Sequence, residues 1–296
     1  MEKRIDAGFR RGDDVLKDLV TQRRAQVESL QSSLAETMKA QEQRGQQRLK
    51  AELAQADDSV RALIDRAQGA RAADKDEIEK IRKRLIDSKP DAMAFNENPG
   101  TYQIAPAAAF AGWLTPYYAT LHGSNGSIYW QGYNPGNFDL SDWASGSGSG
   151  LFGTGAASFH VYLDWWFAFN ADVNKFYSQQ IYVPFNGFHI VRADDAWYDS
   201  KHAEVNISLS ARGYQYNWKG TSSTNVLHVA GDNINVNDRF DGWRTFNYST
   251  LLGADTAYLL VTADFYVYAR GGGSYAELNF SDGNANYVGI PYVYVS

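Results

Sequence analysis

Residues 159–169 read FHVYLDWWFAF, and this stretch decides the fold of the larger part of the chain. Every second side chain falls on one face, which holds Phe159, Val161, Leu163, Trp165, Phe167 and Phe169. The other face holds His160, Tyr162, Asp164, Trp166 and Ala168. An alternation of period two is typical of a β-strand that turns one face to a hydrophobic core. The stretch therefore predicts a strand of a sheet.

Further strand patterns follow this stretch at short spacing. They cover Gln180–Phe185, Phe188–Arg192, Ala203–Arg212, Tyr214–Trp218, Asn225–Ala230, Arg244–Tyr248, Ala257–Ala269, Ser274–Ser281 and Tyr287–Val295. Gly271-Gly272-Gly273 and Asp282-Gly283 supply turn residues between strands. Because no helical pattern separates the strands, residues 156–296 are predicted to form a jelly-roll-like β-sandwich.

The first ninety residues have a different composition. They hold 20 of the 28 Lys and Arg, 17 of the 34 Asp and Glu, and one aromatic residue, Phe9. Apolar residues recur at 3-4 spacing in three runs, which are Leu16-Val20-Arg23-Val27-Leu30-Leu34, Leu49-Leu53-Ala56-Val60-Leu63-Ala67-Ala70 and Ile78-Ile81-Leu85. Such a seam on a polar helix predicts a coiled coil, whose seam is buried against another helix. We therefore expect a segregated α+β chain with a coiled-coil stalk (1–90), a linker and Gly/Ser-rich region (91–155) and a β-sandwich head (156–296).

The phase of the seam drifts between the three runs. This drift predicts a stutter or a break near Gln41–Arg48 and a second near Asp74–Glu77. Pro90 ends the helix. The expected assembly is a homo-oligomer through residues 1–90, a parallel trimer first and a dimer second, and a helical hairpin that folds back near Gly45 is the alternative.

Charge and hydropathy exclude several classes of partner. Residues 91–296 carry 8 basic against 17 acidic residues, a formal charge of −9, which argues against nucleic acid as a partner of the head. The chain has no cysteine, no apolar N-terminal run of the kind found in secretory signals, and no long apolar run that predicts a transmembrane helix. We expect an extracellular or particle-associated protein that uses no cleavable signal.

Aromatic residues in the expected loops and at strand ends are the predicted ligand-binding residues. Rings with a polar edge stack on sugars and fill hot spots of protein interfaces, whereas loop positions are rarely needed for core packing. The set is Trp130, Tyr133, Trp197, Tyr198, Tyr216, Trp218 and Trp243. Packing within the fold is the alternative interpretation.

Residues 232–238 read DNINVND and suggest a cation site. Calcium takes six to eight oxygen ligands, and this segment offers Asp232, Asn233, Asn235, Asn237 and Asp238. A polar turn between strands explains the same residues. We expect no organic cofactor, and the five histidines, His122, His160, His189, His202 and His228, lack the spacing of metal ligands.

Signatures of catalysis are absent from the sequence, which has no G-x-S-x-G, H-E-x-x-H or Walker motif. A pair of carboxylates in one cleft hydrolyses glycosides, and Asp194, Asp195 and Asp199 around Trp197, with Asp164 beside Trp165, are the candidates. An ordinary acidic turn accounts for the first three.

We interpret the chain as a non-enzymatic binding or structural protein, in which a stalk presents heads to glycans or cell-surface receptors and gains avidity from several sites. In layout it resembles phage fibres, injection-particle fibres and bacterial adhesins. Three alternatives remain open. A pore-forming or insecticidal-type toxin would need a longer insertion segment than Ala105–Leu114. A carbohydrate-active enzyme with a coiled-coil arm would need two essential carboxylates, and a self-assembling filament subunit would bind copies of itself.

Overall fold

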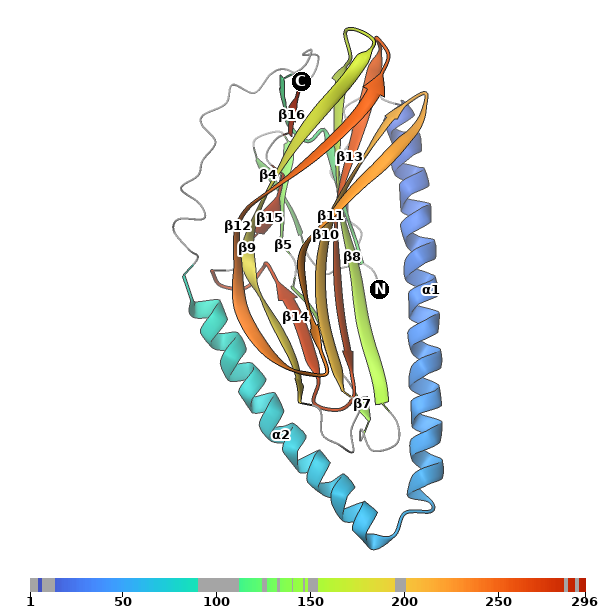
Figure 1. The fold of residues 1–296 in the computed structure, drawn as a ribbon, viewed down its shortest axis with the longest axis vertical. Helices are drawn as coiled ribbons and strands as arrows, with labels where there is room; N and C mark the ends of the chain where they lie inside the picture. Colours follow the sequence, from blue (N-terminus) through green and yellow to red (C-terminus); the bar gives the residue numbers. More distant parts are fainter. Residues whose placement is uncertain are drawn as a thin grey trace.

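The computed structural model describes residues 5–6, 14–89, 112–123, 127–131, 134–139, 141–145, 147–148, 154–194, 201–284, 287–290 and 293–296. Two helices, α1 (Asp14–Leu53) and α2 (Asp58–Asp87), precede strands that form two antiparallel sheets. The sheets stack against each other, and one helix lies on the outer side of each (Figure 1). The prediction of a long N-terminal helical region followed by a β-sandwich is thus confirmed.

Sheet A contains residues 159–169. Its strands run in the order β1 (Ile5–Asp6), β3 (Tyr118–His122), β8 (Thr154–Asn170), β13 (Thr256–Arg270), β10 (His202–Gln215) and β11 (Asn217–Gly231), with β7 (Ser147–Gly148) beside β8. The long strand β8 lies between β3 and β13, so Trp165 stands opposite Ala119 on one side and Val261 on the other. The stretch is therefore an inner strand of the sheet.

Sheet B is organised around β9 (Lys175–Asp194). The strand β12 (Asn233–Leu252) pairs with β9 from end to end, while β14 (Tyr275–Asn279), β15 (Tyr287–Gly289) and β16 (Val293–Val295) share its other edge. Beyond them lie β6 (Ser141–Ser145), β5 (Asn134–Asp139), β4 (Ser127–Gln131) and β2 (Gly112–Leu114). The region predicted as a linker, 91–155, thus contributes strands to both sheets, and the sandwich begins before residue 156.

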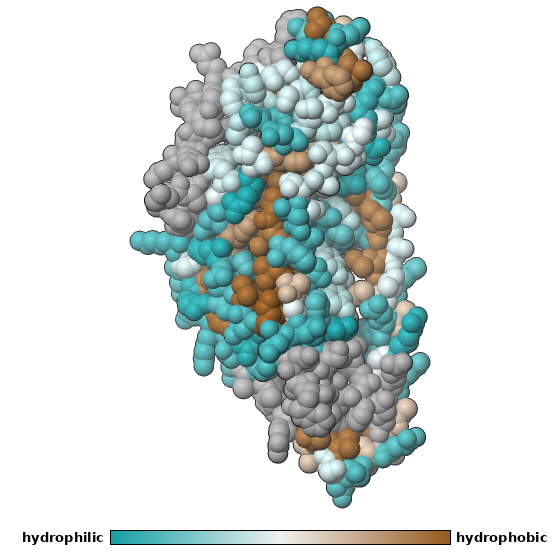
Figure 2. Space-filling view, viewed as in Figure 1, coloured by the Kyte–Doolittle hydropathy of each residue, from teal (hydrophilic) through white to brown (hydrophobic). Residues whose placement is uncertain are grey.

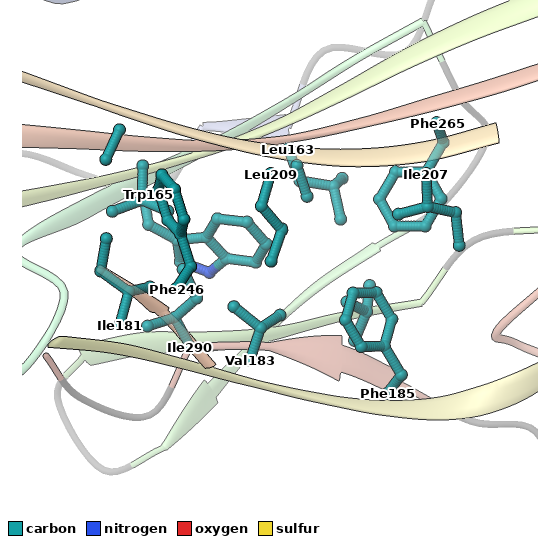
Figure 3. Close-up of a cluster of buried hydrophobic side chains, with 14 of the residues drawn as sticks. Leu163, Trp165, Ile181, Val183, Phe185, Ile207, Leu209, Phe246, Phe265 and Ile290 are labelled. Atoms are coloured by element: carbon teal, nitrogen blue, oxygen red, sulfur yellow. The ribbon is translucent and has the colours of Figure 1, made fainter. Parts of the chain in front are cut away.

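The main core lies between the two sheets, where side chains from their inner faces meet (Figure 3). Trp165 and Phe185 are fully buried, and the ring of Phe265 lies 6.4 Å from that of Phe185. The inward face predicted for β8 is confirmed except at Phe159, which is 45% exposed. Trp166, on the opposite face, is also fully buried, because α1 covers it.

The apolar seam of α1 packs on the outer face of sheet A. Leu16, Leu19 and Val20 are buried against Trp166 and Leu260, in a cluster that also holds Tyr118 and Tyr258. Val27 is buried too, but Leu30 is 48% exposed. The seam that predicted a coiled coil is therefore buried here by a sheet of the same chain.

The seam of α2 packs on the outer face of sheet B in the same way. Leu85 and Ile81 contact Phe188 and Ile190, and Ile78 is buried. Arg82 donates to Glu277 at 3.0 Å, which adds an ion pair to these contacts. Both ends of the helical region are thus attached to the sandwich, so its seam needs no partner chain there. The expected homo-oligomer stays a prediction.

The break between the helices does not lie where the drift of the seam placed it. α1 is continuous through Gln41–Arg48 and α2 through Asp74–Glu77, so neither helix breaks at the predicted place. The chain turns at residues 54–57 instead, and Asp57 caps α2 by accepting a hydrogen bond from the Val60 amide at 2.9 Å. A drift in the phase of the seam requires a break only if the whole seam packs against one partner surface. Here α1 packs on sheet A and α2 on sheet B, so the seam needs no single phase.

The outermost described strands β11 and β12 lie on the same side of the sandwich (Figure 1). Figure 2 shows an apolar band between them. Val226, Leu227 and Val229 of β11 and Ile234 of β12 pack against the main core from this side and stay partly exposed. The two sheets are thus less completely closed along this edge than along their centre.

Candidate functional site

A groove of about 300 Å³ lies between α1 and the outer face of sheet A. Alternate residues of β10 and β13 point outward, because the residues between them fill the core. The groove is lined from α1 by Gln22, Arg23 and Gln26, and from the sheet by Ser210, Arg212, Trp218, Thr221, Leu260 and Thr262. Helix and sheet are both needed to form it.

Trp218 joins the groove to the apolar contact under α1. Its ring lies 6.1 Å from that of Trp166 and 5.3 Å from that of Tyr214, and it packs against the buried cluster that holds α1. The guanidinium carbon of Arg212 lies 4.2 Å from the ring centroid of Trp218. The indole therefore holds the arginine in place by a cation–π contact.

Arg23, the second arginine of the groove, is paired with a buried carboxylate. Its Nε lies 3.0 Å and its Nη2 3.3 Å from the oxygens of Asp164, which is fully buried. Thr262 Oγ1 also donates to Asp164, at 2.5 Å. Burial alone would raise the pKa of Asp164, but Arg23 and His122 beside it hold that pKa well below its ordinary value. Asp164 is thus a structural anion under α1.

Arg212 has no such carboxylate. Among the described residues it forms no ion pair, and its Nε is buried without a hydrogen-bond partner. Burial lowers the pKa of Arg212, and the nearby charge of Arg23 lowers it further. The groove therefore holds a positive charge that its described walls do not neutralise.

A polar and aromatic strip continues from the groove along the outer face of sheet A. The rings of Tyr266 and Tyr268 stack at 6.3 Å with an interplanar angle of 14°, and His160 lies 5.4 Å from Tyr266. Asn206, opposite Tyr266, has a buried Oδ1 without a hydrogen-bond partner among the described residues. Burial raises the pKa of Tyr266 to about 12. The strip from Arg212 to Asn206 is about 20 Å long at about 3.3 Å per residue.

The aromatic residues predicted to bind a ligand do not converge. Trp218 lines the groove on sheet A, whereas Trp243 lies in β12 on the outer face of sheet B, opposite Pro184. Tyr216 is 74% exposed at the turn between β10 and β11, where its hydroxyl bonds to Asp255. Trp130 lies in β4, and the remaining three, Tyr133, Trp197 and Tyr198, lie outside the described residues.

Trp243 belongs to a second aromatic surface on sheet B. The ring of Trp113 lies 6.0 Å from that of Tyr182 and 5.0 Å from that of Tyr294. Tyr182 stands opposite Thr245, two residues beyond Trp243 in β12. The two outer faces of the sandwich thus present separate aromatic surfaces, and the groove described above lies beside the one on sheet A.

Sequence reasoning missed the polar residues of the groove, above all Arg212, Ser210 and Gln26. They carry no motif, and polar residues at alternate strand positions or on an exposed helix face are typical of solvated surfaces. What distinguishes these residues is their position where α1 and sheet A meet.

The segment predicted to bind calcium is mostly strand. Asn233, Asn235 and Asn237 share the outer face of β12, Asp238 points to the opposite face, and Asp232 bonds to His202 Nδ1 at 2.7 Å. Within the described ranges, no three His, Cys, Asp or Glu side chains are placed to hold one metal ion. Calcium here stays a prediction.

The carboxylates considered for glycoside hydrolysis are not brought together in the groove. Asp164 is buried, Asp194 is exposed at the end of β9 opposite Asn233, and Asp195 and Asp199 lie outside the described residues. No Asp or Glu is among the described residues that line the groove. Neither described helix is long and apolar enough to cross a membrane.

Comparisons with known proteins give only distant similarities. No family model and no curated protein matches the chain. Among solved structures, TmCBM61 in complex with β-1,4-galactotriose matches with 9% identity and a TM-score of 0.25, over 60% of this chain and 87% of that one. The carbohydrate-binding module CBM6cm-2 from Cellvibrio mixtus lichenase 5A matches with 12% identity and a TM-score of 0.20, over 58% and 88%.

The enzymatically active domain of bacteriophage CBA120 tailspike protein 4 matches with 9% identity and a TM-score of 0.23, over 60% of this chain and 19% of that one. The β-sandwich thus resembles carbohydrate-binding modules and also parts of enzymes. At TM-scores of 0.25 and below, these similarities carry no argument about function.

Proposed function

We propose that this chain is a non-catalytic carbohydrate-binding protein, with its site in the groove between α1 and sheet A. The groove itself is the observation that carries the proposal, because it sets hydroxyl, amide and guanidinium groups beside an indole ring in about 300 Å³. A sugar offers many hydroxyls on a compact ring, and small-molecule sites combine such polar groups with apolar surface. Ser210, Thr221 and Thr262 supply the hydroxyls, and Gln22 and Gln26 the amides.

The strip beyond the groove supports a chain of several sugars rather than a single one. It places the rings of Tyr266 and Tyr268 on the same sheet face, and Asn206 Oδ1 and Ser158 Oγ lack hydrogen-bond partners among the described residues. Buried polar atoms are nearly always hydrogen-bonded in folded proteins, so these atoms suit an external partner.

Binding without hydrolysis is supported by the lack of a carboxylate among the described groove residues. Glycoside hydrolysis uses two carboxyl groups that flank the scissile bond, and Asp164, the nearest one considered, is engaged with Arg23 and Thr262. The groove therefore favours recognition over cleavage.

Attachment by several sites at once belongs to the same proposal. A stalk that presents heads would require α1 and α2 to leave the sheets. We therefore propose that each chain binds its glycan with both helices packed on the sandwich. Sedimentation of the intact chain tests the assembly, since one copy has a mass of 33.0 kDa and a trimer three times as much. A trimer in solution would support attachment through several sites at once.

The test of the site starts from a glycan array probed with the intact protein, followed by calorimetry on the best ligand. Thr221→Trp places an indole in the groove on an exposed strand position, and Thr245→Trp makes the same change on the outer face of sheet B. We expect Thr221→Trp to abolish binding and Thr245→Trp to leave it unchanged. The reverse pattern would place the ligand on the aromatic surface of sheet B, and no bound glycan would refute the function.

A further inference from the structure

The charge of the groove is more specific than carbohydrate binding requires. Two guanidinium groups line it, and among the described residues that of Arg23 alone has a carboxylate partner, Asp164 at 3.0 Å. Arg212 lies in the same groove with no ion-pair partner among the described residues. Placing a second positive charge near Arg23 without an acid costs free energy, which an anion bound in the groove would offset.

The position of Arg212 also suits a planar anion. Its guanidinium carbon lies over the ring of Trp218, 4.2 Å from the ring centroid. The N–H groups of a guanidinium lie in that plane and form a rigid fork that matches the two oxygens of a carboxylate. A cation–π contact with the indole restrains the guanidinium and uses none of its N–H donors in a hydrogen bond to an acceptor oxygen.

Neutral donors surround this charge. Ser210 lies two residues before Arg212 on β10, Thr221 stands directly opposite Arg212 on β11, and Gln22 lies across the groove on α1. The chain as a whole carries a formal charge of −6, so it repels anions in general. An anionic ligand would have to be held by local contacts, which a guanidinium beside several hydroxyls provides.

We propose that the groove binds an acidic saccharide, with the carboxylate of one sugar on the guanidinium of Arg212 and the sugar hydroxyls on the neutral donors around it. This inference rests on the proposed carbohydrate-binding function and adds the class of sugar to it.

The experiment compares oligogalacturonate with its carboxyl-reduced form, which is a neutral galactose oligosaccharide of the same length, by calorimetry on the intact wild-type chain. We expect the acidic ligand to bind at least about tenfold more tightly, because a charge-assisted bidentate pair is lost on reduction. Oligosaccharides of carrageenan, a sulfated galactan that has no carboxylate, form a third arm. Equal affinity for the acidic and reduced ligands, or binding of the sulfated ligand alone, would overturn the assignment of a carboxylate.

Variants separate the charge from the rest of the site. Arg212→Gln keeps a polar side chain and removes the charge, and we expect it to weaken binding of oligogalacturonate at least about tenfold while binding of the reduced ligand changes less than about twofold. Arg244→Gln is the matched control, because Arg244 is also stacked on a ring, that of Phe240 at 4.5 Å, but lies in β12 outside the groove.

The failure of this inference is distinguishable from that of the proposed function. If Arg212→Gln weakens both ligands equally, the groove binds sugar without reading its charge, and the inference is overturned while the function stands. If neither wild-type ligand nor any array glycan binds, both are refuted. Because the comparison of ligands uses wild-type protein, the inference is tested even if the variant does not fold.

Discussion

Replacing Arg23 with methionine tests whether α1 is held on sheet A as the structure shows. The side chain of Arg23 is 14% exposed and that of Asp164 is fully buried, so the change leaves a carboxylate without its main partner under the helix. Removing one partner of a buried ion pair costs about 3–5 kcal/mol. Because Thr262 still donates to Asp164, we expect the lower end, a loss of about 3 kcal/mol in the free energy of unfolding at pH 8.

Denaturant unfolding followed by tryptophan fluorescence measures this loss, since all 8 Trp lie beyond residue 90. Arg44→Met is the control, because Arg44 is exposed on the same helix and should change stability by less than about 0.5 kcal/mol. If Arg23→Met behaves like this control, α1 does not cover Asp164, and its apolar seam is free to form the coiled coil that the sequence predicted.

The pH dependence gives an independent check with a defined sign. In the wild type the folded-state pKa of Asp164 lies below its ordinary value, so its contribution to stability is present at neutral pH and is lost as pH falls below about 4. Without Arg23, burial still raises the pKa of Asp164 while its strongest opposing partner is gone, so Asp164 is protonated at a higher pH than in the wild type and its buried charge is relieved. The difference in stability between wild type and Arg23→Met should therefore shrink on acidification.

Three further changes test the rest of the fold. Arg82→Met removes the partner of Glu277, which is fully buried under α2, and should lower the free energy of unfolding by about 2 kcal/mol. The loss is smaller than for Arg23→Met because Arg82 is 30% exposed. No loss in denaturant unfolding would mean that α2 is not docked on sheet B. Gly187→Ala should lower the free energy of unfolding by about 2–3 kcal/mol, because a Cβ there would lie 2.3 Å from Phe280 and 2.5 Å from the carbonyl oxygen of Asn279. An unchanged thermal unfolding curve would contradict this close approach. Phe176→Ser, at a position 71% exposed at the end of the sandwich, should leave stability within about 0.5 kcal/mol, and a larger loss would show that this ring is covered in solution.

Much of the secondary structure could be predicted from local patterns. The alternation in residues 159–169 identified the inner strand β8, and turn residues such as Gly271–Gly273 separated strands that the structure confirms. Other strands proved longer than predicted. Asn225–Ala230 and Arg244–Tyr248 are parts of β11 and β12, because pairing with a long neighbour extends a strand through residues of weak propensity.

The candidate site was less predictable. Aromatic residues drew attention to Trp218, which does line the groove, but equally to Trp243 on the opposite sheet. Nothing in the local sequence distinguishes Arg212 from other polar strand residues. Arg212 lines a groove only because α1 packs beside it, and the residues of α1 that line this groove lie almost two hundred positions earlier in the chain.

By itself the sequence determined which faces must be buried: one face of each strand, and a seam along each half of the helical region. It did not determine what buries them, because periodicity reports that a surface avoids water but not which surface covers it. Only the tertiary structure placed Leu16 and Val20 on Trp166, and Leu85 on Phe188, rather than on a neighbouring helix. The groove exists for the same reason, since it forms where a helix and a sheet distant in sequence meet with polar side chains between them.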